Sequence, residues 1–255
     1  MSYDPVAVLR AFANKQAIAF PLLSDEGSHV MRRLGLLNER VQEDHAAYGI
    51  KPDPRHTNLP YPGVFVLDEA GVIVAKRFHE SYRERDSGAA LLAQTLRVLE
   101  PRPPRAADFP GPSIVVGAWL DSPTYSFFQR MHLNLELRLG PGFRIGAPGA
   151  PHGIAPLTVQ VAETPGVVAG AAEWPDAEES RGAGQDGVAL MHGGTIRGLV
   201  PLTFAAAPGA GDLVVTATVS YQLRDDAGRL LEPSSVEVRV GVTELAMVDR
   251  ALPVR

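Results

Sequence analysis

Hydrophobic and polar positions follow different periods in the two halves of the chain. Up to about residue 100, apolar residues recur at helical spacing in some segments and form short continuous runs in others. From about residue 113 onward they alternate strictly with polar residues over several long stretches. Because a helix repeats every 3.6 residues and a strand every two, the first half is predicted to be mixed α/β and the second all β.

The helices of the first half are predicted from capping residues and spacing. Asp4 followed by Pro5 is typical of an N-cap with proline at the first helical position, which predicts a helix over residues 5–16. The apolar residues that follow recur at helical spacing: Val8, Leu9, Phe12 and Ala13. A second helix is expected after Ser28, which can cap it, and a last one opens near Ser87.

Short apolar runs predict the strands of the first half. They cover residues 20–23, a buried-type strand at 64–67 and, after a turn ending at Gly71, a strand at 72–78. Residues 37–62 are polar and rich in proline, and they are predicted to be loop. Residues 101–112 contain five prolines, which suit neither a helix nor a central strand. We therefore expect a semi-rigid linker and a domain boundary there.

The second half is predicted to be an antiparallel β-sandwich. An apolar residue or tyrosine occupies every second position in four stretches: 133–139, 157–161, 213–221 and 236–242. Glycine and proline separate these stretches, as turns between strands require. The acidic stretch 173–187 is expected to be a long surface loop. The predicted organisation is thus a domain over residues 1–100, a linker over 101–112 and a sandwich over 113–248.

Composition excludes several functions. The chain of 255 residues has no cysteine, so by itself it cannot form a disulfide, a thiolate zinc site, an iron–sulfur cluster or a cysteine nucleophile. Its net charge of −5 gives no support to nucleic-acid binding, which favours a basic face. No stretch approaches the roughly 20 apolar residues of a membrane-spanning helix. The first residues do not resemble a signal peptide, so as written the chain is expected in the cytoplasm.

Other candidate motifs have a simpler structural interpretation. Residues 182–187 match the Gly-x-Gly-x-x-Gly dinucleotide fingerprint by letters, but an acidic loop precedes them and a β pattern follows, so a flexible loop is favoured. Seven histidines show no metal-binding spacing, although three of them could meet in one domain: His45, His56 and His79. The remaining histidines are scattered along the chain: His29, His132, His152 and His192. The acidic pairs at 178–179 and 225–226 are expected to be solvated surface carboxylates, and no cofactor is predicted.

Two motifs of the first half resemble a known family. Phe20-Pro-Leu-Leu-Ser-Asp25 and Tyr61-Pro-Gly-Val-Phe-Val-Leu-Asp68-Glu-Ala-Gly-Val-Ile73, in this order, resemble the peroxiredoxins of the alkyl-hydroperoxide-reductase and thiol-specific-antioxidant branch. The resemblance covers about residues 2–98 and implies a thioredoxin-like α/β fold. It further implies that Pro62 is the cis-proline that faces the redox cysteine in such folds.

The same resemblance implies that this thioredoxin-like fold is incomplete. Family members carry a βαβ unit, with the peroxidatic cysteine, before the segment that matches Ser2 to Pro5. Without that unit the strands at 20–23 and 64–78 would have no shared neighbour, and their backbone groups would go unpaired. A misplaced start or a real truncation would both give this sequence.

The second half resembles a different redox protein. Gly198-Leu-Val-Pro-Leu-Thr-Phe204, the strand that ends in Tyr221-Gln222, and Pro233 are similar to the N-terminal, immunoglobulin-like domain of the thiol:disulfide interchange protein DsbD. Its two cysteine positions fall on Arg224 and Arg229, which cannot form a disulfide. We expect these arginines to flank a hairpin turn with local ion pairing, worth about 0–1 kcal/mol when exposed.

Two functional hypotheses follow. The first is a redoxin-family protein whose antioxidant or thiol-dependent oxidoreductase activity this cysteine-free chain cannot perform alone. The second is a non-enzymatic interaction protein that binds a protein partner, such as a redox protein, through the hairpin around Arg224 and Arg229 or through its sheet edges. In that case the first half is structural or is completed by another chain. A metal-dependent enzyme that uses the scattered histidines is the third and weakest alternative.

Overall fold

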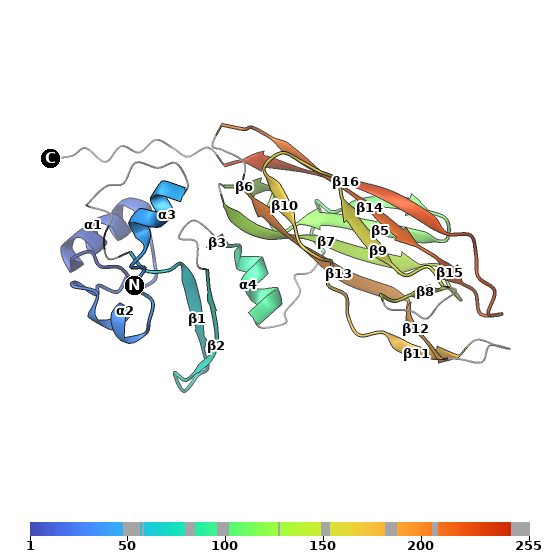
Figure 1. Cartoon of the computed structure of the whole chain (residues 1–255), viewed down its shortest axis with the longest axis horizontal. Coiled ribbons are helices and arrows are strands. Elements are labelled where there is room, and N and C mark those ends of the chain that lie inside the picture. Colours follow the sequence, from blue (N-terminus) through green and yellow to red (C-terminus); the bar gives the residue numbers. More distant parts are fainter. Residues whose placement is uncertain are drawn as a thin grey trace. The chain divides into compact units, whose positions relative to one another are not determined.

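The computed structural model divides the chain into two compact units, Met1–Arg85 and Asp86–Arg255. It describes residues 1–47, 57, 59–79, 85–95, 102–126, 128–148, 154–181, 188–205 and 209–245. Figure 1 shows the helices of the first unit in blue and the strands of the second from green to red. Each unit is described by itself.

The described part of the first unit consists of short helices followed by one hairpin. The helices are α1 (Val6–Gln16), α2 (His29–Arg33) and α3 (Val41–Ala47), and the antiparallel hairpin is formed by β1 (Gly63–Leu67) and β2 (Ile73–Phe78). The helix predicted over residues 5–16 and the two hairpin strands are confirmed. The predicted cap is wrong, because the N-cap of α1 is Pro5 and not Asp4, and α1 begins at Val6. In the described ranges, no helix is long and apolar enough to cross a membrane.

The cap of α2 differs from the predicted one. The side chain of Ser28 makes no capping hydrogen bond. Instead the carboxylate of Asp25 accepts hydrogen bonds from the backbone N–H groups of Val30, at 3.0 Å, and Met31, at 2.8 Å. A carboxylate can accept both bonds at once and its negative charge favours the first turn of a helix, which explains why Asp25 takes this role.

Two other predictions for the first unit are wrong. Residues 20–23 form no strand, and Phe20 and Leu23 are largely exposed, because this segment pairs only through an isolated bridge between Ser2 and Ser24. Residues 37–62 are not all loop, since they contain α3. Val41, the first residue of α3, is buried and fixes this helix in the unit by packing, which polar composition did not reveal.

The hairpin also differs from the buried strand that its apolar run predicted. In the described residues β1 and β2 pair only with each other. Leu67 and Ile73 are at least half exposed, and so are Val72 and Val74. A continuous apolar run is buried only if a sheet or helix packs on both of its faces. The described residues do not pack over all of the hairpin.

The second unit contains α4 (Gly88–Thr95) and a β-sandwich. Strand β3 (Arg85–Asp86) lies at the boundary of the units. The other strands are β4 (Ala107–Gly111), β5 (Ile114–Leu120), β6 (Thr124–Tyr125), β7 (Gln129–Leu139), β8 (Arg144–Gly146), β9 (Thr158–Val161), β10 (Val167–Ala169), β11 (Glu178–Arg181), β12 (Val188–Gly193), β13 (Thr195–Phe204), β14 (Leu213–Tyr221), β15 (Leu223–Arg224) and β16 (Ser234–Glu244).

Three sheets build the sandwich. The largest has the strand order β10–β13–β7–β5–β4, the second the order β6–β16–β14–β9, and a smaller one the order β11–β12–β8–β15. The inward residues of β7, β13 and β14 form one continuous core, which includes Leu135, Val200 and Ala217. The alternating stretches predicted at 133–139, 157–161, 213–221 and 236–242 are confirmed as β7, β9, β14 and β16.

The boundary between the units lies earlier than predicted. It falls after Arg85, so that α4 belongs to the second unit, where it packs against β7. The predicted linker 101–112 contains β4, which pairs with β5. Pro110 is tolerated there because β4 is the edge strand of its sheet, where a missing N–H costs no ladder bond.

The acidic stretch 173–187 is likewise not one long loop. Glu173 pairs with Leu199, and Glu178–Arg181 form β11, an edge strand that pairs with β12. Charged side chains suit an edge strand because they discourage pairing with other chains. Residues 182–187, which carry the glycine-rich motif, lie outside the described residues.

Truncating Leu135 to alanine tests the sandwich core. Leu135 is 1% exposed on the central strand β7, so Leu135→Ala should lower the free energy of unfolding by about 2–5 kcal/mol. Urea denaturation followed by circular dichroism measures this change. The control is Val168→Ala on β10, where the side chain is 62% exposed and the change should stay within about 0.5 kcal/mol. Equal effects of the two variants would contradict the assigned core.

Candidate functional site

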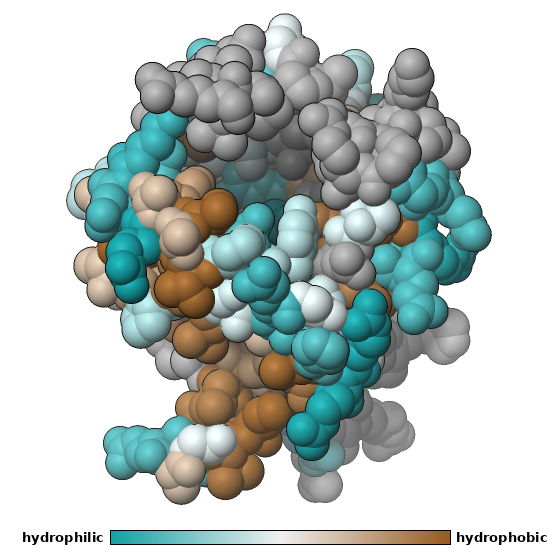
Figure 2. Space-filling model, turned by 90° about the vertical axis from the view of Figure 1, so that its left-hand side faces the viewer, coloured by the Kyte–Doolittle hydropathy of each residue, from teal (hydrophilic) through white to brown (hydrophobic). Residues whose placement is uncertain are grey.

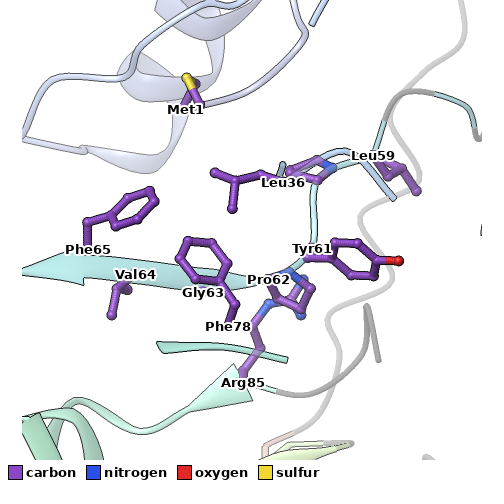
Figure 3. A pocket seen from close by; sticks show the side chains of 11 residues that line it. Met1, Leu36, Leu59, Tyr61, Pro62, Gly63, Val64, Phe65, Phe78 and Arg85 are labelled. Atoms are coloured by element: carbon purple, nitrogen blue, oxygen red, sulfur yellow. The ribbon is translucent and has the colours of Figure 1, made fainter. Parts of the chain in front are cut away.

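A pocket of about 570 Å³ lies within the first unit, at the start of β1 (Figure 3). Its volume is within the range of about 300–1,000 Å³ that is usual for ligand sites. The pocket is lined by Met1, Leu36, Leu59, Pro60, Tyr61, Pro62, Gly63, Val64, Phe65, Phe78 and Arg85. Pro62, the site residue implied by the peroxiredoxin resemblance, is therefore part of this lining.

Backbone hydrogen bonds hold one wall of the pocket in place. The N–H of Tyr61 donates to the carbonyl of Leu36 at 2.7 Å, and the N–H of Asn38 donates to the carbonyl of Leu59 at 2.8 Å. Leu37 and Pro60 form an antiparallel bridge between these two bonds. The segment before β1 is thus extended and paired, although its prolines predicted loop.

Two aromatic rings form the opposite wall. The ring centroids of Phe65 and Phe78 lie 4.9 Å apart at an angle of 60°. The Phe78 ring covers Gly63, where an added Cβ would lie only 2.4 Å from a ring carbon. Glycine is therefore required at this position because the ring occupies the space of a side chain.

The lining offers little polar chemistry. Burial lowers the pKa of Arg85, the only charged residue in the lining. The Tyr61 hydroxyl points away from Phe65 and Phe78 in Figure 3. Among the described residues that line the pocket there is no thiol, serine hydroxyl, imidazole or carboxylate, so the phenol of Tyr61 is their one hydroxyl group. The arrangement is suited to binding apolar groups.

The peptide bond before Pro62 is trans, as are the other peptide bonds of the described residues. The resemblance implied a cis bond, and that expectation is wrong for this structure. The trans form is intrinsically favoured by about 0.5–1 kcal/mol before proline. It is compatible here with the pairing on both sides, since the Pro62 carbonyl accepts the N–H of His79 at 2.9 Å and Tyr61 donates to Leu36.

The arginines at the DsbD cysteine positions have different environments. Arg229 is exposed, and its Nε donates to the Asp225 carboxylate at 3.1 Å within the turn. This local ion pair agrees with the expectation for the hairpin. Arg224, by contrast, is 3% exposed on β15, beside Arg144 of β8. Both residues of β15 are buried, which turn composition did not predict for Arg224.

The described histidines do not assemble into a metal site. His79, His132 and His192 are buried, whereas His29 is exposed. In the described ranges no group of three histidines and carboxylates could hold a metal ion. His56 and His152 lie outside these ranges, and so does the side chain of His45. The proposed meeting of His45, His56 and His79 is therefore untested.

A cluster of charged side chains lies on the face of β7 that points away from the core. Glu136 on β7 is 6% exposed, and its two carboxylate oxygens accept four hydrogen bonds from three arginines. Arg102 and Arg138 donate to Oε1 at 3.2 and 3.0 Å, and Arg197 donates twice to Oε2, at 3.0 and 2.7 Å. Burial raises the pKa of Glu136, but the hydrogen bonds from the three guanidiniums outweigh it and hold the pKa below its usual value.

The buried carboxylate of Asp121 forms a neighbouring group on the same face. It accepts hydrogen bonds from the backbone N–H of His132 at 2.7 Å, from the Asn134 amide at 2.9 Å and from the Ser87 hydroxyl at 3.0 Å. Ser87 thus donates to the carboxylate and not to the imidazole, so these groups do not have the order of a catalytic triad. Burial raises the pKa of Asp121, but its hydrogen bonds and the nearby imidazole bring it below the usual value.

Neither the pocket nor the two polar groups around Glu136 and Asp121 could be predicted from the sequence. Leu36 and Leu59 flank or lie within a segment predicted as loop, where apolar residues carry no period. A signal was present for the aromatic wall: the turn at 68–71 sets a register that places Phe65 diagonally opposite Phe78 on one face of the hairpin. The polar residues of β7 that point away from the core gave no sign of burial in the sequence, because alternation does not reveal what covers that face of the sheet.

The comparisons with known proteins agree with the resemblance of the first half. A model of the AhpC/TSA family matches residues 1–76. This supports a redoxin-family relationship for that part of the chain, which is just under a third of its length. No curated protein matches the chain.

The solved structures found by fold similarity include the redox domains that the second half resembles. They include the reduced DsbD N-terminal domain of Neisseria meningitidis, with 14% identity and a TM-score of 0.30 over 44% of this chain and 77% of that one. The N-terminal periplasmic domain of ScsB from Proteus mirabilis matches with 12% identity and a TM-score of 0.37 over 52% and 51%. The same Neisseria domain in complex with the PilB N-terminal domain matches with 17% identity and a TM-score of 0.30 over 42% and 73%. Similarity at this level carries no argument about function.

Replacing Glu136 with glutamine tests the arginine cluster. Glu136→Gln removes the charge that three guanidiniums share, and at pH 7 it should lower the free energy of unfolding by about 1–3 kcal/mol. Because the pKa of Glu136 is lowered in the folded state, its contribution is present above the unfolded-state pKa of about 4.3 and is lost as pH falls through the folded-state pKa. In urea titrations, the difference in the free energy of unfolding between Glu136→Gln and wild type should therefore be smaller at pH 3 than at pH 7. A difference that does not change with pH would contradict the charged cluster.

His192 should make stability depend on pH near neutrality. It is 5% exposed, its Nε2 has no hydrogen-bond partner among the described residues, and burial lowers its pKa. In the unfolded chain the imidazole of His192 binds a proton at a higher pH than it does in the folded chain. The free energy of unfolding therefore falls as pH drops below about 6.5. Between pH 7.5 and 5.5, His192→Leu should lose less stability than wild type in urea titrations. An equal loss in both proteins would exclude this role for His192.

Proposed function

We propose that this chain is a non-catalytic redoxin-family protein that binds a protein partner through the apolar pocket of its first unit. The observation that carries the proposal is the composition of the pocket: its described lining is mainly apolar and contains no thiol, serine hydroxyl, imidazole or carboxylate. The first unit then corresponds to a thioredoxin-like α/β fold and the second to an immunoglobulin-like sandwich.

Thiol chemistry is not available to this chain alone. Peroxide reduction and disulfide exchange both begin with attack by a thiolate, and the chain has no cysteine. The residues at the DsbD cysteine positions are arginines, one buried and one paired within its turn. Recognition of another protein needs no thiol. A redoxin relationship without a cysteine therefore favours a binding function over a catalytic one.

Exposed apolar surface is concentrated in the unit that holds the pocket. Of the seventeen large apolar side chains that are exposed in the described residues, twelve lie in the first unit, which makes up a third of the chain. Four of them lie on or beside the hairpin: Leu67, Val72, Ile73 and Val74. Scattered exposed apolar residues are normal, but a concentration of this kind marks an interaction surface.

The pocket supports partner binding better than the sandwich hairpin does. Arg229 is engaged by Asp225 within its own turn, and Arg224 is buried on β15. The two arginines of this hairpin are therefore not available to form new ion pairs with a partner at low cost. The pocket, in contrast, can accept apolar side chains and exclude water from them.

Peptide binding tests this function. The probe is a library of fluorescein-labelled hexapeptides in which valine, leucine or phenylalanine alternates with threonine, measured by fluorescence polarisation with the full chain. Leu36→Glu places a charge in the pocket wall and should weaken binding about tenfold or more. Leu34→Glu is the matched control, because Leu34 is exposed and does not line the pocket, and it should bind as wild type does.

Two results would overturn the proposal. One is the absence of binding by every peptide of the library, and the other is equal binding by the Leu36→Glu and Leu34→Glu variants. A parallel assay should find no consumption of hydrogen peroxide by the purified chain with dithiothreitol, beyond that of the reagent alone. Consumption that scales with protein concentration would overturn the non-catalytic assignment.

A further inference from the structure

The first strand of the hairpin has one open edge. In the described residues β1 pairs with β2 on one side and with no strand on the other. An extended strand carries N–H and C=O groups on both edges, and an unpaired edge is a template for another strand. The open edge of β1 can be assigned residue by residue from the hydrogen bonds that flank it.

Antiparallel alternation shows which backbone groups point away from β2. The Pro62 carbonyl accepts the N–H of His79, so this pair faces inward across the hairpin. Inward and outward residues alternate along an antiparallel strand. The N–H and C=O groups of Gly63 and Phe65 therefore point toward the open edge, in register with Tyr61.

The beginning of this edge is already occupied by a strand-like segment. Tyr61, two residues before Gly63, donates its outward N–H to Leu36, and Leu59 accepts from Asn38 on the same side. Leu37 and Pro60 complete an antiparallel bridge there. The edge thus pairs with residues 36–38 up to Tyr61 and is open from Gly63 onward, which is where the apolar pocket lies.

This edge lacks the features that keep other edges from pairing. The five residues of β1 are Gly-Val-Phe-Val-Leu, with no proline and no charge. The opposite strand β2 carries Lys76 and Arg77, and the edge strand β4 of the second unit carries Asp108 and Pro110. Lysine, other charges and proline are the usual protection of edge strands. The edge strands β9 and β10 of the second unit also lack them, but they have only four and three residues, so β1 is the longest of these unprotected edges.

The surface around this edge is apolar as well. Figure 2 shows brown, hydrophobic surface gathered over the hairpin of β1 and β2. Val64 and Phe65 line the pocket beside the open edge, with Leu36 on the opposite wall. A strand added at Gly63 and Phe65 would bring the side chains of one of its faces to this pocket.

We infer that the partner contributes an extended, mainly apolar segment that adds as a strand to the open edge of β1. Its backbone pairs with Gly63 and Phe65, and its side chains on one face fill the pocket. This inference rests on the proposed function and specifies how the same site recognises its partner. It follows the general mode in which backbone hydrogen bonds supply affinity and pockets supply specificity.

Amide hydrogen exchange of the full ¹⁵N-labelled chain tests the strand pairing. The probe is the tightest-binding hexapeptide of the valine, leucine or phenylalanine and threonine library. At saturation the exchange of the Gly63 and Phe65 amides should slow by about tenfold or more, because each becomes hydrogen-bonded. The amides of Val64 and Val66 are internal controls, since they already face β2 and should change much less.

A matched peptide separates the pairing from the pocket. N-methylation of alternate backbone amides keeps every side chain but removes the donors on one edge. It should weaken binding about two- to tenfold for each hydrogen bond lost, whereas methylation on the other edge should have little effect. The two peptides must be compared with the same chain under the same conditions.

The outcomes distinguish the two proposals. One outcome overturns strand addition and leaves the pocket function standing. In that outcome peptides bind and Leu36→Glu abolishes binding, but N-methylation on either edge leaves the affinity unchanged and the exchange rates of the Gly63 and Phe65 amides stay the same. Slowed exchange at Lys76 and Phe78 in place of Gly63 and Phe65 would also overturn the assignment to β1. If no peptide binds, the proposed function is overturned and this inference with it.

Discussion

Every extended strand must satisfy its backbone hydrogen-bonding groups on two edges, and this constraint separates the two units of the chain. In the second unit the central strand β7 lies between β13 and β5, and its apolar side chains face β14 and β16 across the core. Its edges carry charges, proline or short strands. Among the described residues of the first unit, β1 pairs on one side only, and its other edge is apolar and lies beside a pocket. The difference in pairing explains why one unit is self-contained and the other is suited to a partner.

The chemistry open to the chain is limited by the residue types it contains. Residues 1–76 match the AhpC/TSA family, yet the chain has no thiol. At the start of β1 the structure instead offers an apolar recess closed by Phe65, Phe78 and Leu36. A recess of this kind can lower the free energy of a bound apolar group by removing it from water. It cannot attack a peroxide or a disulfide, which needs a thiolate.

The outer face of the sandwich shows how buried carboxylates keep hydrogen-bond partners. Glu136 shares its charge with three guanidiniums, and Gly117 of β5 leaves the space that the Arg102 guanidinium occupies. Asp121 in turn accepts bonds from His132, Asn134 and Ser87. Because every carboxylate in these groups is hydrogen-bonded, burial of charge is offset by pairing.

The sequence by itself determined the elements with a strong local period and the chemistry that composition forbids. The alternation of β7, β9, β14 and β16, the helix α1, the turn at residues 68–71 and the absence of thiol chemistry all follow from residue order or composition alone. These features depend on neighbours within a few residues or on residue counts, which a sequence contains.

Only the tertiary structure decided what covers each element. Among the described residues, Phe20 and Leu23 form no strand because their segment has no strand partner apart from the bridge at Ser24. Leu67 of β1 is exposed although its apolar run predicted burial, whereas the polar Asn134 and Glu136 of β7 are buried. The boundary at Arg85, the burial of Arg224 and the pocket at Pro62 arise from segments distant in sequence, such as residues 36–38 against 59–61. Local periodicity gives the direction of a side chain, but burial depends on what packs against it, which is a property of the fold.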